Sequence, residues 1–295
     1  MSSSDLLGFH ISVANTLLTG LEYAISSNIK SVQFFAGNNR SSSIKFKTKY
    51  TDEDKKNIHK YIKTHDMKVF IHGVYVINLC SNTSTYIHDN ILHDLELAHD
   101  LGAIGVIVHL GSAVDKKYEN AINNLVSNIV TICDKMATNI KSSVKLILET
   151  NSGQGNQVGV SIKDFYDIYS QIPQKYHKNI GICIDTAHIA AAGYHINTMD
   201  GIKSYLDEFD KLFGLQNISL IHLNDNPYTI GSRRDVHEII GNGVLFKTKE
   251  NLKALEWFLK QLIQKKIPIV LETSGAGKEG STYPTQIEYL RKLLV

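Results

Sequence analysis

The alternation of short apolar runs with helical segments predicts that this chain folds as a single-domain (β/α)8 barrel of the TIM type. Eight runs rich in β-forming residues occur along the 295 residues, and segments with an apolar residue at every third or fourth position lie between them. Near-continuous apolar strands separated by helices are typical of a parallel sheet that is covered on both faces. Eight such units, in a chain somewhat longer than the ~250 residues that a closed barrel needs, favour the barrel over an open doubly wound sheet.

The predicted strands are distributed over the whole chain. They are the runs at 6–11, 31–37, 68–73, 105–111, 145–151, 180–186, 219–225 and 268–274. The clearest helical segments are 51–65, 85–101, 116–138 and 249–266. Thr51 before three acidic residues, and Ser161 three residues before Asp164, are typical helix start signals. No Pro/Gly/Ser-rich linker divides the chain, so we expect residues 1–295 to form one domain, in which 226–248 is the one oversized loop.

The charge and cysteine content exclude several classes of protein. The 31 Lys and Arg residues nearly balance the 29 Asp and Glu residues, and only 20% of the chain is charged, which excludes a disordered or supercharged chain. Three cysteines without a CxxC spacing argue against a disulfide framework and against a cysteine-based zinc site. The start of the chain does not resemble a signal peptide and no apolar stretch approaches ~18 residues, so we expect an intracellular protein that does not span a membrane.

Six of the eight predicted strands have a side chain that can bind a metal ion at or near their carboxyl end. These residues are His72, His109, Glu149, Asp185, His222 and Glu272. The carboxyl ends of barrel strands form the active-site face, so residues far apart in sequence would converge there. His188 after the sixth strand, and Asp235 and His237 in the oversized loop, raise the number of candidate ligands to nine, which are five imidazoles and four carboxylates. His10 ends the first predicted strand and is expected to face the same mouth.

Nine ionisable side chains at one end of an apolar barrel indicate a metal cluster. A single His or Glu at a strand end is more often a hydrogen-bonded structural residue, but burying nine of them would be costly without cations or close pairing. Imidazole and carboxylate ligands without thiolates favour Zn²⁺ or Mn²⁺, and nine ligands are too many for one tetrahedral ion. Two or three ions suit hydrolysis of a phosphate ester. A metal-dependent sugar isomerase or epimerase on a related barrel is the alternative, and it would need fewer ligands around one or two ions.

Four segments around the candidate ligands have distinctive sequences. They are IHGVYVINL at 71–79, LETNSGQGNQVG at 148–159, GICIDTAHIAAAGY at 181–194 and IHLNDNPYTIGSRRDVHEIIGNG at 221–243. In sequence and in order these segments resemble the endonuclease IV type of apurinic/apyrimidinic (AP) endonucleases, also called AP endonuclease family 2, and the last two are the strongest similarities. The resemblance covers nearly the whole chain.

The resemblance implies a trinuclear zinc site to which all nine candidates belong. Glu149 would bridge two ions, with His72 and His109 completing the first and Asp185, His222 and Glu272 the second, while His188, Asp235 and His237 would hold the third. Three Zn²⁺ ions are therefore expected, with Mn²⁺ as an alternative at one site. Glu149 or Glu272 would be the catalytic carboxylate that steers the proton of the nucleophile, and the sequence does not choose between them.

The resemblance also implies the substrate. The family cleaves the phosphodiester on the 5′ side of an abasic site, leaving a 3′-hydroxyl and a 5′-deoxyribose phosphate, and it trims blocked 3′ ends. The expected partner is double-stranded DNA with abasic sites, bound by a monomer. Because the abasic sugar must be extruded from the duplex, side chains must fill the gap. The expected DNA-binding residues are Arg40, Tyr75 and Val76, which match the inserting positions, and Arg233 and Arg234, which would supply positive charge.

Two more residues are expected to support the ligands, and three positions depart from the family pattern. His10 and Asp225 would contact the ligands without binding a metal ion themselves. Leu110 stands where Pro is usual, Val236 where Arg is usual, and Asn242 where Glu is common. All nine ligands are retained. The changes at Val236 and Asn242 are also compatible with a third function, that of a barrel that binds nucleic acid but no longer cleaves it.

Overall fold

In the computed structural model, which describes residues 3–13, 16–41, 43–82, 84–114, 117–140, 143–273 and 282–294, eight parallel strands form a closed barrel. The strands are β1 (Leu7–His10), β2 (Ser31–Phe35), β3 (Lys68–His72), β4 (Gly105–His109), β5 (Lys145–Glu149), β6 (Ile180–Asp185), β7 (Ile218–His222) and β8 (Ile269–Leu271). Each strand pairs with its neighbours in sequence, and β8 closes on β1. The predicted barrel is therefore confirmed.

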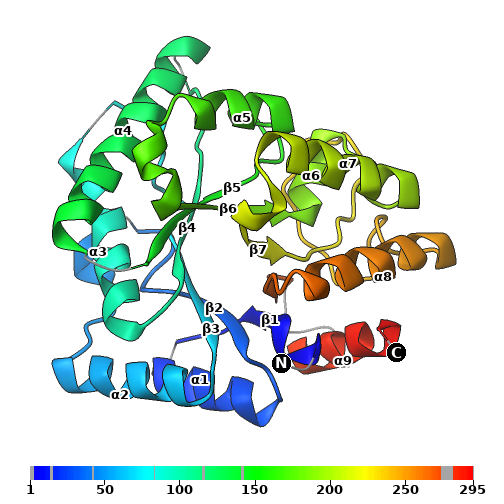
Figure 1. Ribbon diagram of the computed structural model, residues 1–295, viewed down its shortest axis with the longest axis horizontal. Coiled ribbons are helices and arrows are strands. Elements are labelled where there is room, and N and C mark those ends of the chain that lie inside the picture. The colour runs from blue at the N-terminus through cyan, green and yellow to red at the C-terminus, as the bar shows by residue number, and fades with distance from the viewer. Residues whose placement is uncertain are drawn as a thin grey trace.

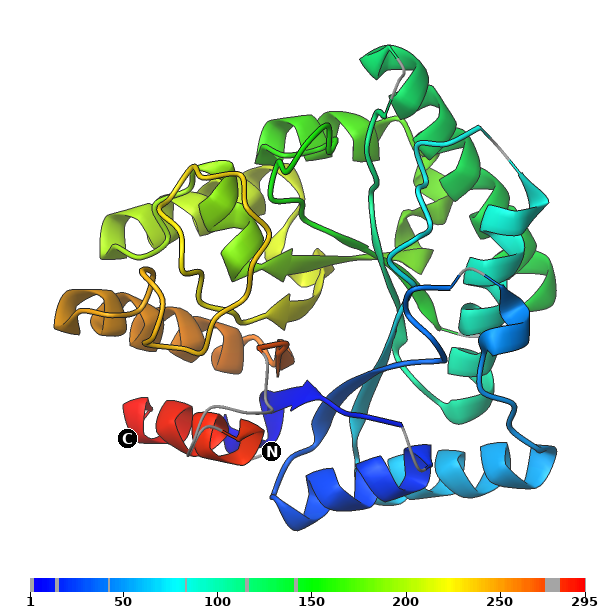
Figure 2. The ribbon, with the colours of Figure 1, turned by 180° about the vertical axis from the view of Figure 1, so that it is seen from behind.

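The helices follow one another around the strands in chain order, so that α9 lies beside β1 and the two ends of the chain come close together (Figures 1 and 2). They are α1 (Leu17–Ser26), α2 (Asp52–Thr64), α3 (Thr85–Leu101), α4 (Tyr118–Asn139), α5 (Ile162–Ser170), α6 (Thr186–Ala192), α7 (Met199–Leu212), α8 (Lys249–Gln264) and α9 (Tyr283–Leu293). Short 3-10 helices cover Ser3–Leu6, Ile44–Phe46, Gln174–Asn179 and Leu215–Asn217.

Local sequence signals account for where the helices begin. The Thr51 hydroxyl accepts a hydrogen bond from the backbone of Asp54, whose carboxylate accepts from the backbone of Thr51, so both predicted partners form a capping box at α2. Ser161 accepts from the backbone of Asp164 at the start of α5. The helix expected at 85–101 has the observed bounds of α3. Among the described residues, no helix is long and apolar enough to cross a bilayer.

The strand pleat directs the candidate ligands into the barrel. Six apolar side chains form one interior cluster, and they are Phe70, Ile107, Ile147, Cys183, Leu220 and Val270. Each stands two residues before one of the six strand-end candidates, and alternate residues of a strand point to the same face. Residues between the two sets, such as Ile71 and Val108, belong instead to the larger cluster against the helices. A shift of one residue in any strand would turn its ligand into that helical layer.

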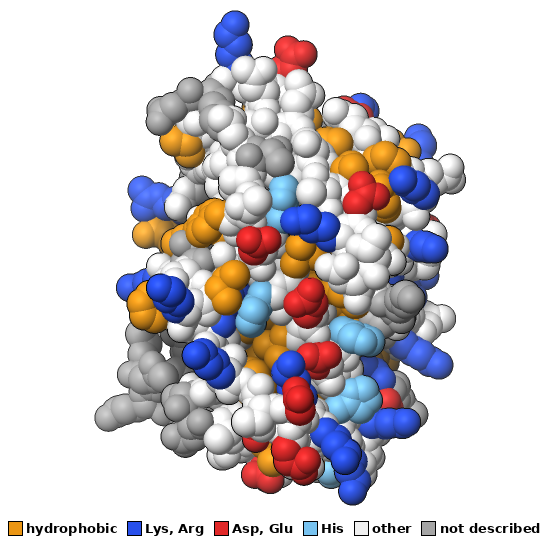
Figure 3. Space-filling model, turned by 90° about the vertical axis from the view of Figure 1, so that its left-hand side faces the viewer, with side chains coloured by type: hydrophobic (Ala, Val, Ile, Leu, Met, Phe, Trp, Pro, Cys, Tyr) orange, Lys and Arg blue, Asp and Glu red, His pale blue; other side chains and the backbone are white. Residues whose placement is uncertain are grey.

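The outer surface of the helical layer carries both signs of charge. On the side that faces left in Figure 1, Lys and Arg side chains are interspersed with Asp and Glu among the described residues (Figure 3). Helices α2 and α3 are joined by a partly exposed ion pair, Lys55 with Asp100 at 2.8 Å. Over the described residues of this side, the positive charge is therefore not continuous.

Candidate metal centre

All nine candidate ligands meet at the carboxyl ends of the strands. Seven of them line one cavity of about 610 Å³, and these are His72, His109, Glu149, His188, Asp235, His237 and Glu272. Asp185 and His222 lie beneath this cavity and are fully buried at 0% exposure. Four groups of three or four side chains have ligand atoms within 4.8 Å of one another, which is close enough to hold a metal ion.

The first group consists of His72, His109 and Glu149. Glu149 Oε2 lies 3.3 Å from His72 Nε2 and 3.4 Å from His109 Nδ1. The other ring nitrogen of His72, Nδ1, donates to the carbonyl of Gly73 at 2.8 Å, which leaves Nε2 directed at the carboxylate. Such a backbone contact fixes the tautomer of a metal-binding histidine.

The second group surrounds His222. His222 Nδ1 lies 2.8 Å from Glu149 Oε1, 3.0 Å from Glu272 Oε2 and 3.9 Å from Asp185 Oδ2. Glu149 therefore uses one oxygen in the first group and the other in the second, as a bridging carboxylate would. Cys183 also lies close to Glu149 and His222, but burial raises the pKa of its thiol to about 12, so the sulfur is protonated.

The third group contains Asp185, His188 and His237, and Asp235 lies beside its two histidines. His188 Nε2 lies 2.9 Å from Asp235 Oδ1, and its Nδ1 donates to the carbonyl of Thr150 at 2.8 Å. His237 Nε2 is 3.5 Å from both Asp235 Oδ1 and Asp185 Oδ2. Asp185 thus stands between the second and third groups, whereas the sequence placed it only in the second.

The spacing of these atoms fits bound cations. Two ligand atoms on one tetrahedral zinc ion, each roughly 2.0–2.1 Å from it, are roughly 3.3–3.4 Å apart. The contacts of His72 and His109 with Glu149, at 3.3 and 3.4 Å, have this separation. In the described part of the chain, His109 Nδ1, Glu149 Oε2 and His237 Nε2 are buried atoms without a hydrogen-bond partner. Buried polar atoms are rarely left unpaired, so these three support the interpretation of a metal centre.

Opposite charges stabilise the ionised forms of the buried groups. Burial alone would raise the pKa of Glu149, but His109, His222 and His72 outweigh it and hold that pKa well below its usual range. The pKa of Glu272 falls to about 2 for the same reason, chiefly because of His222, and the pKa of Asp235 falls to about 2 beside His188. The carboxylates are therefore ready to bind cations near neutral pH.

Three supporting residues were not recognised as such from the sequence. Asn224 Nδ2 donates to Asp185 Oδ2 at 2.7 Å, and its Oδ1 accepts from the backbone of Glu272 at 3.0 Å. The Thr150 hydroxyl accepts from the backbone of Asp185 at 3.0 Å. Gln33 contacts both His222 and Glu272.

Asp225 has a different role from the one expected. Its carboxylate accepts hydrogen bonds from the backbone N–H groups of Asn226, Gly241, Gly243 and Leu245 at 2.8–3.2 Å. Its backbone also pairs with that of Glu238. Asp225 therefore organises the loop 226–248 that carries Asp235 and His237, and its hydrogen bonds go to that loop rather than to a ligand.

The expected DNA-contacting residues lie around the mouth of the cavity. Tyr75 and Val76 are exposed by 52% and 47%, and the Tyr75 ring lies 5.4 Å from the ring of His72 and 5.9 Å from that of His109. The backbone N–H of Tyr75 donates to the carbonyl of Asn39 at 3.1 Å, which joins its loop to the loop of the exposed Arg40. The two loops therefore form one continuous rim.

Arg233 and Arg234 lie on the opposite rim. Both are exposed, and the backbone N–H of Arg233 donates to the carbonyl of Ala191 in α6 at 3.0 Å. The Arg234 guanidinium lies 4.4 Å from the centre of the Tyr228 ring, a cation–π contact. Val236, which departs from the family pattern, is 40% exposed between the proposed ligands Asp235 and His237.

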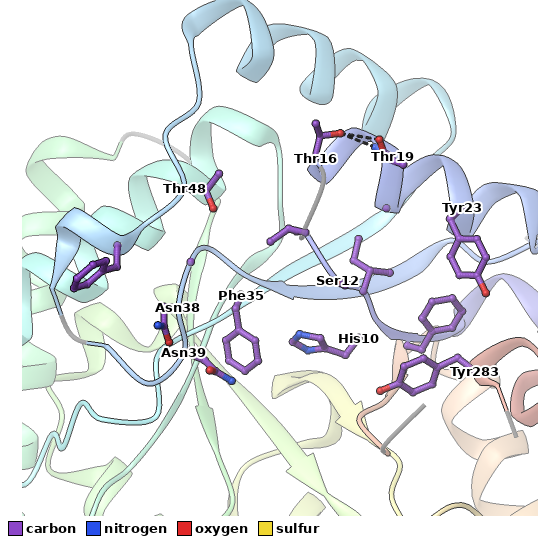
Figure 4. A pocket seen from close by; sticks show the side chains of 16 residues that line it. His10, Ser12, Thr16, Thr19, Tyr23, Phe35, Asn38, Asn39, Thr48 and Tyr283 are labelled. Carbon is purple, nitrogen blue, oxygen red and sulfur yellow. Dashed lines mark hydrogen bonds between the residues drawn. The ribbon is translucent and has the colours of Figure 1, made fainter. Parts of the chain in front are cut away.

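His10 lies behind the metal centre, next to a second cavity. Its ring is 4.6 Å from that of Phe35, and both line a cavity of about 960 Å³ (Figure 4). Burial lowers the pKa of His10 to about 4. The negative charge of Glu272 raises this pKa only in part, and the charges of His72 and His222 lower it further. His10 reaches the proposed ligands through Gln33, whose Nε2 lies 3.1 Å from His10 Nδ1.

Known proteins are similar to this chain in fold and in sequence. The family described as xylose isomerase-like TIM barrel matches residues 21–293. Apurinic-apyrimidinic endonuclease 1 of Saccharomyces cerevisiae is 30% identical over 290 residues, which cover 97% of this chain and 75% of the yeast protein. The crystal structure of endonuclease IV from Thermus thermophilus has a TM-score of 0.79 at 22% identity, covering 98% of each chain.

A D-tagatose 3-epimerase-like protein has the same fold, with a TM-score of 0.70 at 18% identity over 98% of this chain and 96% of that one. At these identities the two structures show only that the fold is shared. The closer relationship is shown by the sequence similarity to the yeast enzyme. The chain belongs to the xylose isomerase-like TIM-barrel family and, within it, to the endonuclease IV type of AP endonucleases.

Proposed function

We propose that this protein is a zinc-dependent DNA-repair endonuclease. It would hydrolyse the phosphodiester bond 5′ to an abasic site in duplex DNA, leave a 3′-hydroxyl and a 5′-deoxyribose phosphate, and remove blocking groups from 3′ ends. The observation that carries this proposal is the set of three adjacent ligand groups around one cavity, joined through Glu149 and Asp185. When bound there, zinc ions would activate water and neutralise charge on the phosphate and on the leaving oxygen.

The two candidate catalytic carboxylates differ in their surroundings. Both oxygens of Glu149 contact imidazoles and its side chain is 1% exposed, which suits a bridging ligand. The Glu272 side chain is 10% exposed at the cavity, and its two oxygens accept from Gln33 Nε2 at 2.6 Å and from Asn224 Nδ2 at 3.5 Å. We therefore assign the bridging role to Glu149, and assign to Glu272 the acceptance of a proton from the attacking water.

The rim supports DNA as the substrate. Arg40 and the pair of Tyr75 and Val76 lie on two loops that are joined by a backbone hydrogen bond, from which they would enter a duplex and fill the space of an extruded sugar. Arg233 and Arg234 on the other rim would contact phosphates. The rim thus combines exposed apolar side chains with positive charge.

The test is incision of a duplex that contains one tetrahydrofuran abasic analogue. Metal-replete protein should carry close to three zinc ions per chain and cut the duplex on the 5′ side of the analogue, and a chelator should abolish cutting. The matched control is the same duplex with an intact nucleotide at that position. An uncut abasic duplex with zinc-loaded protein would overturn the proposal.

The two alternatives predict different outcomes. A sugar isomerase or epimerase would bind one or two ions and convert a free ketose, without salt-dependent binding to duplex DNA. Three ligand groups around one cavity are more than such an enzyme would need. A barrel that binds DNA without cleaving it, the alternative suggested by Val236 and Asn242, would bind both metal ions and the abasic duplex but leave the duplex uncut.

A further inference from the structure

Gln33 connects the proposed metal centre to His10 through hydrogen bonds. It lies in β2, which carries no candidate ligand, and its side chain is fully buried at 0% exposure. Its amide Oε1 is 2.7 Å from His222 Nε2, and its amide Nε2 is 2.6 Å from Glu272 Oε1 and 3.1 Å from His10 Nδ1. One uncharged side chain thus contacts two proposed ligands and a further histidine.

The carboxylate of Glu272 determines the orientation of this amide. A carboxylate that binds a cation is ionised and can only accept hydrogen bonds. Gln33 must therefore present its NH₂ group to Glu272 and its carbonyl oxygen to His222. The reverse orientation would place two acceptors 2.6 Å apart in a buried site, which would leave both without a donor.

The orientation of Gln33 in turn determines the tautomer of His222. Because Gln33 Oε1 can only accept, His222 must carry a proton on Nε2. With a cation bound in the second group, a neutral His222 would have its lone pair on Nδ1 and directed at that cation; this atom lies 2.8 Å from Glu149 Oε1 and 3.0 Å from Glu272 Oε2. This is the atom that faces the second ligand group.

We propose that Gln33 is a positioning residue for the second metal ion, setting the tautomer of His222 and the orientation of Glu272 together. The inference rests on the metal centre of the proposed function. The remaining N–H of Gln33 donates to His10 Nδ1, so a neutral His10 carries its proton on Nε2. His10 is therefore the far end of the same chain, beside the second cavity (Figure 4).

The test compares zinc affinity and histidine protonation in full-length wild type and Gln33→Met. Methionine has a similar length without the amide, so we expect the zinc affinity of one site to fall by roughly 10–100-fold, as for other residues that support metal ligands. Competition with a chelator, followed by elemental analysis, measures this as the loss of one ion in about three. In ¹⁵N-histidine spectra of zinc-loaded protein, the slowly exchanging Nε2–H signal of His222 should disappear in the variant.

Two further variants separate positioning from general packing. Gln33→Glu keeps an acceptor for His222 and should retain the Nε2–H signal. Asn128→Leu is the matched control, because Asn128 is also 0% exposed and accepts from a histidine, His88 Nε2, at 2.8 Å between α3 and α4. It should lower the free energy of unfolding without changing zinc affinity. Equal losses of zinc affinity in Gln33→Met and Asn128→Leu would contradict the positioning role.

The same experiments distinguish this inference from the proposed function. If wild type binds zinc and cuts abasic DNA, but Gln33→Met retains full zinc affinity and the Nε2–H signal, the inference on Gln33 is wrong and the function stands. If wild type binds zinc without cutting, and Gln33→Met loses affinity for one ion, the inference holds and the function is wrong. Wild-type protein that binds no zinc would overturn both.

Discussion

Lys47 and Asp94 form a buried ion pair that secures the loop after β2 to helix α3. Lys47 Nζ lies 2.5 Å from Asp94 Oδ2, and the two side chains are 3% and 2% exposed. The backbone of Lys47 also pairs with that of Gly37, which closes the loop that carries Arg40. Because a buried charge without its partner is costly, this pair holds one of the proposed DNA-contacting loops in place.

Lys47→Met should lower the free energy of unfolding by ~3–5 kcal/mol, because it removes the lysine cation from the buried Asp94 carboxylate and leaves it only the partly exposed His93 ring, at 3.3 Å. Lys47→Met with Asp94→Leu should recover most of that loss, since neither charge then remains. Urea denaturation at pH 7 measures both effects. The control is Lys163→Met, which breaks an exposed pair with Asp167 and should change stability by less than ~0.5 kcal/mol. Equal effects of the two single substitutions would contradict the account.

Glu149→Ala should abolish incision and remove two zinc ions together. Glu149 is the carboxylate that contacts His72 and His109 through one oxygen and His222 through the other. Elemental analysis after dialysis and the nicking assay measure the two effects. Glu256→Ala, which removes a 38% exposed carboxylate on α8, should leave both unchanged. A Glu149→Ala protein that retains three ions would show that Glu149 is not a bridging ligand.

Arg40→Ala should weaken binding to the abasic duplex by roughly tenfold, or ~1.4 kcal/mol, while its affinity for intact duplex changes less. The physical reason is that an inserted side chain fills a space that exists only at the lesion. Fluorescence anisotropy with the two duplexes at one salt concentration measures this difference. Lys253→Ala, an exposed cation on α8, is the matched control and should change neither affinity. Loss of zinc from Arg40→Ala would contradict the assignment.

The repeated strands of the barrel, and the ligands at their carboxyl ends, could be predicted from the sequence. Seven of the eight strands lie within the predicted runs and β7 begins one residue earlier, because the hydrophobic pattern of a buried parallel strand is continuous. The position of the ligands follows from the same pattern. His72 stands two residues after Phe70, and the pleat alone directs both side chains into the barrel.

The contacts that support the site could not be predicted, because they join residues without a sequence signal. Gln33 is an isolated polar residue in an apolar strand, and its partner His222 is 189 residues away. Asn224 and Asp225 are neighbours, yet one directs ligands and the other organises a loop, a difference that depends on which face of the chain each side chain occupies. The pairing of Lys47 with Asp94 depends on how a loop packs on a helix.

His10 should make the metal-free protein less stable as the pH falls from about 6.5 to about 4. Its pKa is lowered from 6.5 to about 4 in the folded protein, chiefly by burial. Within that window the unfolded chain binds a proton that the folded chain does not, so this contribution to the free energy of unfolding is present above about pH 6.5 and is lost as the pH falls through about 4.

Replacing His10 removes this titration. The free energy of unfolding of metal-free wild type, minus that of metal-free His10→Gln, should therefore be constant above about pH 7 and should decrease towards pH 4. Urea denaturation at several pH values measures the difference, in which the titrations of the other histidines largely cancel because both proteins share them. A difference that stays constant from about pH 8 to about pH 4 would mean that His10 accepts a proton as readily in the folded chain as in the unfolded one.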